Sequence, residues 1–270
     1  MARLAVRLAI LFGLLSIPCA ARAADATLVS LTTPRGAKQA FILIKPAKPV
    51  AAVILFAGGH GALGLQSASA MDWGAGNFLV RTREMFAAQG LMVAVVDAPS
   101  DRSKGMTGEF RMSRDHAGDI GAVVTHLKKQ ADVPVWLVGT SMGTFSAANG
   151  AVQKLGTRGL VLTSTITRAK PEWKIADSHP DGVASMSLGK VSGPALIVSH
   201  AKDGCEITPA LDAPKLKRRL SASKPVEVVI LNGGSPPQSQ PCEARSQHGF
   251  LGIESEAVDG IARFVKAHGG

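Results

Sequence analysis

The sequence predicts an α/β fold in which helices cover both faces of a mostly parallel central sheet. Short apolar runs alternate along the 270 residues with longer stretches of helical periodicity, and strands that are joined through helices run parallel. The chain is 46% hydrophobic, which is enough to build a large core. No internal repeat or low-complexity segment divides it.

Seven apolar runs are expected to be strands. They lie at residues 40–45, 53–57, 91–96, 134–138, 160–163, 195–199 and 226–231. The third run, LMVAVV, contains no polar residue and is typical of a strand buried on both faces.

Four helices are expected between and after these strands. They span residues 78–89, 113–129, a stretch from about 142, and 253–267. Ser113 is a candidate N-cap of the second helix. The weakly patterned residues 164–193 are long enough for a short lid but too few for a separate domain. We therefore expect residues 24–270 to form a single domain without a large cap.

The N-terminus is typical of a cleaved Sec-type signal peptide. Arg3 and Arg7 precede a short apolar run at residues 8–17, and Ala21 and Ala23 occupy the positions that a signal peptidase reads. The apolar run is too short for a permanent membrane span. We expect cleavage after Ala23, a periplasmic or secreted protein, and no stable membrane insertion afterwards. A retained N-terminal anchor is the alternative.

Composition excludes some classes of partner. The formal net charge is +10, and removing the three arginines of the signal peptide lowers it to +7. The absence of tyrosine and the low aromatic content of 4% argue against a nucleic-acid groove built on stacked aromatic rings.

His and Cys residues lack metal-ligand spacing, so we expect no metal and no cofactor.

The pentapeptide GTSMG centres on Ser141, directly after a predicted strand and before a predicted helix. Gly139 and Gly143 remove side chains that would clash in a tight reversal, and this allows Ser141 a strained conformation with an exposed hydroxyl. The start of the helix directs free N–H groups at any negative charge that develops there. Alone, the motif also fits a serine in a glycine-rich loop.

Partners for such a serine follow it in the order acid, then histidine. Asp203 stands just past the strand ALIVS, with Glu206 and Asp212 as local rivals. His248 stands in a loop before the last helix. The remaining histidines precede Ser141 or the acid, or end the chain: His60, His116, His126, His179, His200 and His268. Ser141, Asp203 and His248 are therefore the candidate catalytic residues, because an imidazole oriented by a carboxylate activates a serine hydroxyl.

A glycine-rich loop, FAGGHGALG, follows an early strand. It is interpreted as half of an oxyanion hole, with Gly59 as the first choice of N–H donor, His60 as the second, and Met142 supplying the other half. The same loop matches the dinucleotide motif GxGxxG from Gly59. That alternative needs an acid about 20 residues on, whereas the first strand that ends in an acid reaches Asp97, much farther along the chain.

Two cysteines, Cys205 and Cys242, remain after signal cleavage removes Cys19. An even pair in an exported protein indicates a disulfide. A Cys205–Cys242 bond would tie the loop of the acid to the loop of the histidine. It would either hold the Asp–His pair in register or stabilise the protein in general.

These motifs resemble those of the α/β-hydrolase superfamily. GTSMG is similar to its nucleophile elbow, FAGGHG to its oxyanion loop, HAKD to its acid turn and QHGF to its histidine loop. The resemblance is greatest to small exported bacterial enzymes of the dienelactone-hydrolase-like and esterase group, although this chain has serine where dienelactone hydrolases have cysteine. It implies a sheet of about eight strands and hydrolysis of esters, thioesters or amides.

The expected function is that of an exported serine hydrolase that cleaves small-molecule carboxylic esters through an acyl-enzyme. Two alternatives stay open: a peptidase or amidase with the same triad, and a catalytically silent binding protein on the same scaffold.

Overall fold

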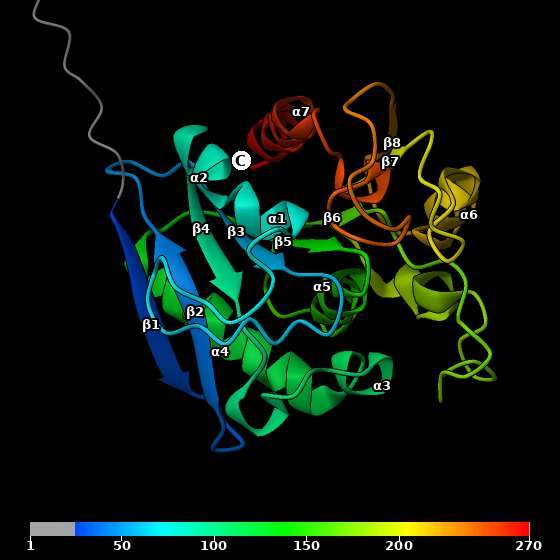
Figure 1. The fold of residues 1–270 in the computed structure, drawn as a ribbon. Coiled ribbons are helices and arrows are strands. Elements are labelled where there is room, and N and C mark those ends of the chain that lie inside the picture. Colours follow the sequence, from blue (N-terminus) through cyan, green and yellow to red (C-terminus); the bar gives the residue numbers. More distant parts are fainter. Residues whose placement is uncertain (1–24, 270) are drawn as a thin grey trace, which may run out of the picture.

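The computed structural model describes residues 25–269 (Figure 1). The signal peptide expected over residues 1–23, with its cleavage site, lies outside the described residues.

The centre of the molecule is an eight-stranded sheet with the order β1-β2-β4-β3-β5-β6-β7-β8. Strand β2 pairs antiparallel with both β1 and β4, and the remaining neighbours pair parallel. The strands are β1 (Ala26–Thr32), β2 (Lys38–Ile44), β3 (Ala51–Phe56), β4 (Leu91–Val96), β5 (Val135–Thr140), β6 (Gly159–Thr163), β7 (Ala195–His200) and β8 (Val226–Leu231). The mostly parallel sheet predicted from the alternation of strands and helices is confirmed.

Helices cover both faces of this sheet (Figure 1). They are α1 (Phe78–Arg81), α2 (Arg83–Ala88), α3 (Gly108–Arg111), α4 (Arg114–Gln130), α5 (Gly143–Val152), α6 (Ala213–Arg219) and α7 (Glu254–Ala267). Helices α1, α2 and α7 pack on one face, and α4, α5 and α6 on the other. Within the described residues there is no large cap domain, and no helix combines the length and apolar character needed to cross a membrane.

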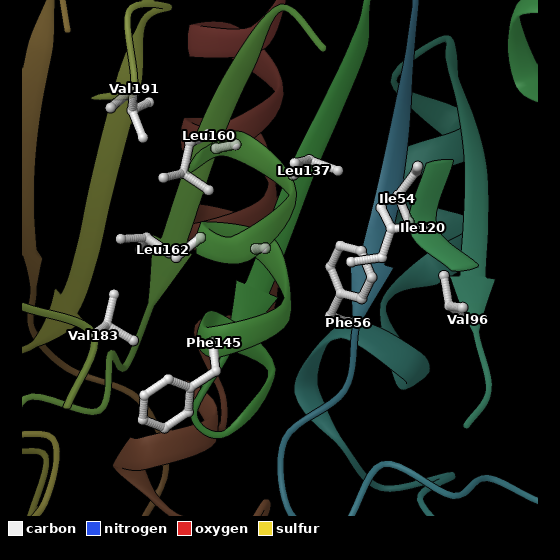
Figure 2. Close-up of a cluster of buried hydrophobic side chains, with 14 of the residues drawn as sticks. Ile54, Phe56, Val96, Ile120, Leu137, Phe145, Leu160, Leu162, Val183 and Val191 are labelled. Carbon is white, nitrogen blue, oxygen red and sulfur yellow. The ribbon is translucent and has the colours of Figure 1, made fainter. Parts of the chain in front are cut away.

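Each face carries its own apolar core because side chains alternate along a strand. On the α4–α5 face, Ile54 and Phe56 of β3 and Leu137 of β5 meet Ile120 and Phe145 of the helices (Figure 2). The intervening strand residues pack against α1, α2 and α7. The central strands are therefore buried on both sides, as their unbroken apolar runs predict.

The seven predicted strands are all present, but the sequence analysis missed β1, α3 and α6. The predicted helix 78–89 is two short helices, because Thr82 ends α1 and its hydroxyl donates to the Phe78 carbonyl at 2.7 Å. Ser113 caps α4 as predicted, accepting from the His116 N–H at 3.1 Å. Residues 164–193 hold only two 3-10 turns, at 182–185 and 188–190.

The topology defines a crevice at the carboxyl ends of β3 and β5. After β3 the chain adds β4 on one side, then crosses over to add β5 on the other. Loops that leave two such strands diverge, and this switch point is where open α/β sheets bind ligands. The glycine-rich loop follows β3 and Ser141 follows β5, so the fold brings these two predicted features together.

Candidate active site

Ser141 occupies a strained turn between β5 and α5. Its φ is +52°, in the left-handed region that non-glycine residues rarely adopt. Two neighbours hold the turn: the Ser141 N–H donates to the Thr163 carbonyl on β6 at 3.1 Å, and the Ser141 carbonyl accepts from the Thr144 N–H at 2.9 Å. Strain of this kind persists only where surrounding contacts enforce it, and it is common at functional sites.

The glycines around Ser141 are required by close backbone packing. A Cβ at Gly139 would lie 2.5 Å from the carbonyl oxygen of Gly143, and one at Gly143 would collide with the Phe56 carbonyl. Across the turn, a Cβ at Gly58 would lie 2.9 Å from the Ser141 Cβ. Glycine at positions 58 and 143 therefore allows the elbow and the loop after β3 to pack closely.

Asp203 and His248 form a direct pair. Asp203 follows β7, and His248 lies in the short 3-10 turn Gln247–Gly249 before α7. The Asp203 Oδ2 lies 3.0 Å from the His248 Nδ1, and the two side chains are 0% and 5% exposed. Thr208 donates its hydroxyl to the same carboxylate oxygen at 2.9 Å, and the Cys205 N–H donates to the other at 3.0 Å. The buried carboxylate is thus fully paired.

The rival acids lie elsewhere in the structure. The Glu206 side chain is exposed and 4.0 Å from Lys170. Asp212 accepts from the Thr167 hydroxyl at 2.8 Å and from Arg168. Of the three acids considered from the sequence, only Asp203 contacts His248.

Backbone contacts fix the position of the His248 ring. The Ser164 hydroxyl donates to the His248 carbonyl at 2.8 Å, and the His248 N–H donates to the Ser246 hydroxyl at 3.2 Å. The Nε2 is buried and has no hydrogen-bond partner among residues 25–269, so the structure contains no Ser141–His248 hydrogen bond. Both side chains nevertheless line one cavity.

That cavity, which we name the His248 cavity, has a volume of about 470 Å³. Its lining includes Ser141 and His248, together with Gly59, Trp73, Asn77 and Arg245. The volume lies within the range of pockets that bind small molecules. Ser141 and His248 therefore border the same space.

Asp97 anchors the glycine-rich loop. This carboxylate, at the end of β4, accepts hydrogen bonds of 2.6–3.3 Å from the backbone N–H groups of Leu63, Gly64, Leu65 and Ala98. The loop runs on to α1 without forming a helix directly after its glycines. The alternative dinucleotide interpretation is therefore wrong in its geometry, because that motif requires a strand–turn–helix.

Arg111 supports the same loop from beneath. Its side chain is completely buried; Nη2 donates to the Gly59 carbonyl at 3.2 Å and Nη1 to the Ser146 hydroxyl of α5 at 3.0 Å. Within the described part of the chain, Arg111 has no ion-pair partner, and its Nε has no hydrogen bond. Burial lowers the pKa of Arg111 to about 9, which leaves the guanidinium charged at neutral pH.

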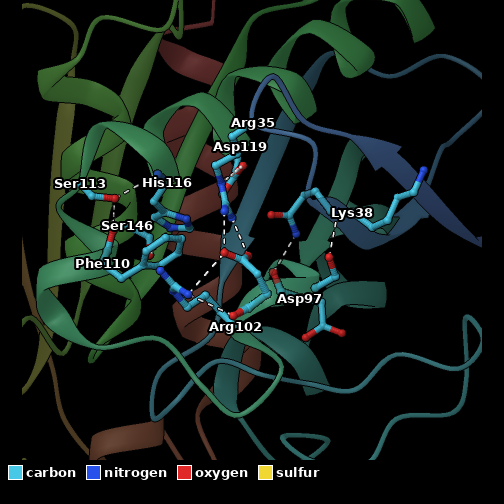
Figure 3. Close-up of polar contacts among 12 residues, drawn as sticks. Arg35, Lys38, Asp97, Arg102, Phe110, Ser113, His116, Asp119 and Ser146 are labelled. Atoms are coloured by element: carbon cyan, nitrogen blue, oxygen red, sulfur yellow. Dashed lines mark hydrogen bonds and ion pairs between the residues drawn. The ribbon is translucent and has the colours of Figure 1, made fainter.

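His116 extends this buried polar group. Its Nε2 lies 2.9 Å from the Ser146 hydroxyl. Figure 3 shows the two residues beside each other. Burial, with the positive charges of Arg111 and Arg35, lowers the pKa of His116 to about 3, so the ring is neutral. Arg35 itself is paired, donating to Asp119 at 2.8–3.0 Å (Figure 3). Arg111 thus contributes an unpaired positive charge directly behind the elbow and its neighbouring loop.

The predicted disulfide is present. Cys205 and Cys242 are bonded at 2.03 Å and lie 37 residues apart in the sequence. Cys205 also donates its N–H to Asp203, while Cys242 lies four residues before Ser246, whose hydroxyl accepts from the His248 N–H. The bond therefore joins the two backbone segments that hold the Asp–His pair.

Three residues of the site were missed by the sequence analysis. Thr208, Ser164 and Arg111 make contacts that depend on segments far apart in the chain. Of these three, only Thr208 could have been proposed from the sequence. It lies five residues after Asp203, close enough along the chain for its hydroxyl to contact the Asp203 carboxylate. No group of three or more potential metal ligands occurs in the described portion of the chain.

The comparisons identify the fold. No protein-family model matches the chain, and no curated protein matches its sequence. Solved structures do match: an esterase from Pyrococcus furiosus has a TM-score of 0.67, 15% identity and 92% coverage of each chain. Dienelactone hydrolase from Anabaena variabilis has a TM-score of 0.61 and 15% identity, covering 92% of this chain and 100% of its own.

A puromycin-hydrolysing peptidase from Mycobacterium tuberculosis also matches, with a TM-score of 0.66 and 14% identity over 94% of this chain and 41% of the peptidase. At this level of identity the likeness establishes the α/β-hydrolase fold, as the sequence motifs predict.

Proposed function

We propose that this protein is a serine hydrolase that cleaves small-molecule carboxylic esters. The observation that carries the proposal is the Asp203–His248 pair, 3.0 Å apart, in a histidine turn that shares one cavity with the strained Ser141. The fold is shared with esterases and dienelactone hydrolase. A binding protein would have no need of a strained serine beside a paired, buried histidine.

The reaction follows from the roles of these three groups. Asp203 accepts the Nδ1–H of His248, which leaves Nε2 unprotonated and able to take the Ser141 proton. Ser141 Oγ then attacks the acyl carbon, and His248 returns the proton to the leaving alcohol. Water then takes the place of the alcohol: His248 takes a proton from the water as it attacks the acyl carbon, and gives the proton to Ser141 Oγ as the acyl bond breaks and the acid leaves. The free Nε2 fits this role, since hydrogen bonds between nucleophile and base often form only with substrate bound.

The oxyanion formed during attack needs N–H donors, and we assign these to Met142 and His60. No hydrogen bond from the N–H of Met142, Gly59 or His60 occurs within residues 25–269. Arg111 binds the Gly59 carbonyl on the buried side of the loop. In a planar trans peptide the N–H points opposite to the carbonyl, so the N–H of His60, in the same peptide unit, faces away from Arg111. This favours His60 over Gly59, the first choice from sequence.

Arg111 also strengthens that donor. A positive charge on the carbonyl side polarises the Gly59–His60 peptide, which makes its N–H a better partner for a developing oxyanion. The charge is buried, so solvent screens it little. We therefore give Arg111 a positioning role in the proposed mechanism.

A matched substrate series tests the proposal. We expect the mature protein to hydrolyse p-nitrophenyl esters and the Ser141→Ala variant to lose this activity while keeping its circular dichroism spectrum. Failure of folded wild-type protein to hydrolyse any ester or amide would favour the catalytically silent alternative.

The second candidate is a peptidase or amidase with the same triad, supported by the structural likeness to a puromycin-hydrolysing peptidase. Matched p-nitroanilides and short peptides separate the two functions. Cleavage of amides at rates equal to or above those of the matched esters would select the amidase.

We further propose that the protein is exported to the periplasm or secreted. The disulfide supports this, since such bonds persist in oxidising compartments. Expression with the native N-terminus followed by mass determination of the extracytoplasmic protein tests it. The expected mature chain begins at Ala24, and an uncleaved chain would contradict the proposal.

A further inference from the structure

A second cavity adjoins the proposed catalytic residues from the other side of the glycine-rich loop. This space, the Met142 cavity, has a volume of about 400 Å³ and is lined by Gly59, His60, Met106, Met142, Trp173 and Ile175, among others. Gly59 is common to it and to the His248 cavity. The two cavities therefore meet at the loop proposed to bind the oxyanion.

The walls of the Met142 cavity are mainly apolar. Ile175 is buried, Trp173 is partly buried, and both pack against the core under α5. Methionine side chains are flexible and polarisable, so Met106 and Met142 adapt to ligands of different shape. The segment 172–175 belongs to the weakly patterned residues 164–193, which are long enough for a short lid.

The chemistry of ester cleavage assigns a different part of the substrate to each cavity. The acyl carbon carries three groups: the carbonyl oxygen, the leaving alcohol and the acyl chain. The alcohol must lie near His248, because this residue gives it a proton. His248 lines only the first cavity, whereas His60 and Met142, which supply the proposed oxyanion donors, line only the second.

We infer that the Met142 cavity binds the acyl chain of the ester and that the His248 cavity binds the alcohol. This inference rests on the proposed function. The occupant of the Met142 cavity is a neutral, apolar acyl chain longer than acetyl. Glu109 and Glu172 are exposed and line the cavity beside Lys174, so an acyl chain that ends in a carboxylate is disfavoured.

The matched variants Trp173→Ala and Trp73→Ala test this division, because each removes one tryptophan from one cavity. With wild type, kcat/KM for p-nitrophenyl esters rises about fourfold per added methylene from acetate to hexanoate, the fold-change equivalent to burying one CH₂ group. In Trp173→Ala the hexanoate-to-acetate ratio falls at least fivefold, because the cavity loses part of its wall to solvent.

Trp73→Ala is the control. Trp73 packs on Gly59 and stacks on His60, with ring centroids 3.9 Å apart, so its loss lowers kcat for all esters. The ratio of kcat/KM for hexanoate to kcat/KM for acetate stays within twofold of the wild-type ratio. A loss of activity that is equal for all esters does not change this ratio, because both values come from the same variant. An unchanged ratio in Trp173→Ala, or a larger change in Trp73→Ala, overturns the inference.

A covalent adduct of the wild-type protein provides a second test, which does not depend on the folding of any variant. In a p-nitrophenyl hexylphosphonate, Ser141 Oγ forms a bond to phosphorus, p-nitrophenolate leaves, and His248 takes the hydroxyl proton. We expect a crystal structure of the wild-type adduct to show the hexyl chain in the Met142 cavity. A hexyl chain in the His248 cavity overturns the inference. No adduct and no ester hydrolysis would refute the proposed function instead.

Discussion

Removal of the Cys205–Cys242 bond gives the most quantitative prediction for this fold. The bond closes a chain segment with a sequence separation of 37. In the chain-entropy model, a loop of this size corresponds to about 4 kcal/mol of stability, because the cross-link restricts the unfolded chain. The double variant Cys205→Ala/Cys242→Ala removes the bond without leaving a free thiol in the mature protein.

The expected consequence is a large loss of thermal stability. For a chain of this size, each kcal/mol lowers the melting temperature by roughly 2–4 °C, so the loss should be roughly 8–16 °C. This fall in melting temperature is measured by circular dichroism, on the double variant and on wild type with and without reductant. The reasoning would be refuted if the melting temperatures of wild type with and without reductant differed by less than about 2 °C.

Catalysis separates the two possible roles of the bond. Cys205 donates its N–H to Asp203, and the turn beyond Cys242 receives the His248 N–H, so the bond holds both partners. If it keeps the pair in register, kcat of the double variant at 20 °C falls while the protein stays folded and KM changes little. An unchanged kcat would assign the bond to stability alone.

Three further predictions follow from the buried polar groups. Asp203→Asn should lower kcat by about 10⁴ without unfolding the protein, because an amide no longer selects the His248 tautomer; steady-state kinetics with a spectrum of the folded state check it. Arg111→Met should lower kcat up to about a hundredfold with little change in KM, with partial recovery in Arg111→Lys; an equal loss in both variants would contradict a role for the charge. Burial lowers the pKa of His116 from 6.5 to about 3 in the folded state. Between these two pH values the unfolded state therefore binds more protons than the folded state, so the free energy of unfolding falls as the pH drops from 6.5 towards 3. Urea melts of His116→Gln should show a smaller fall over that range than wild type, and an equal fall would refute the assignment.

The residues that could be predicted from sequence are those with a local signal. Ser141 and Asp203 stand at the ends of unbroken apolar runs, which predict buried strands, and His248 precedes an amphipathic helix. In a parallel sheet the carboxyl ends of strands share one edge. Local patterns therefore sufficed to bring these three residues to the same edge of the molecule.

Features without a local signal were missed. Strand β1 is an exposed edge strand with no buried residue, so its sequence lacks the apolar run that marks the other strands. From the sequence, Arg111 would be expected to be an ordinary surface cation. Its contact with the Gly59 carbonyl is formed only in the tertiary fold. The preference for His60 over Gly59 likewise depends on the orientation of a single peptide.

Covalent labelling of Ser141 tests the central claim most directly. The mature protein is incubated with a fluorophosphonate, and the modified peptide is identified by mass spectrometry. The proposed mechanism predicts one adduct per chain, on Ser141, which is lost in folded Ser141→Ala and strongly slowed in Asp203→Asn. The absence of any adduct on folded wild-type protein, or an adduct that persists in Ser141→Ala, would contradict it.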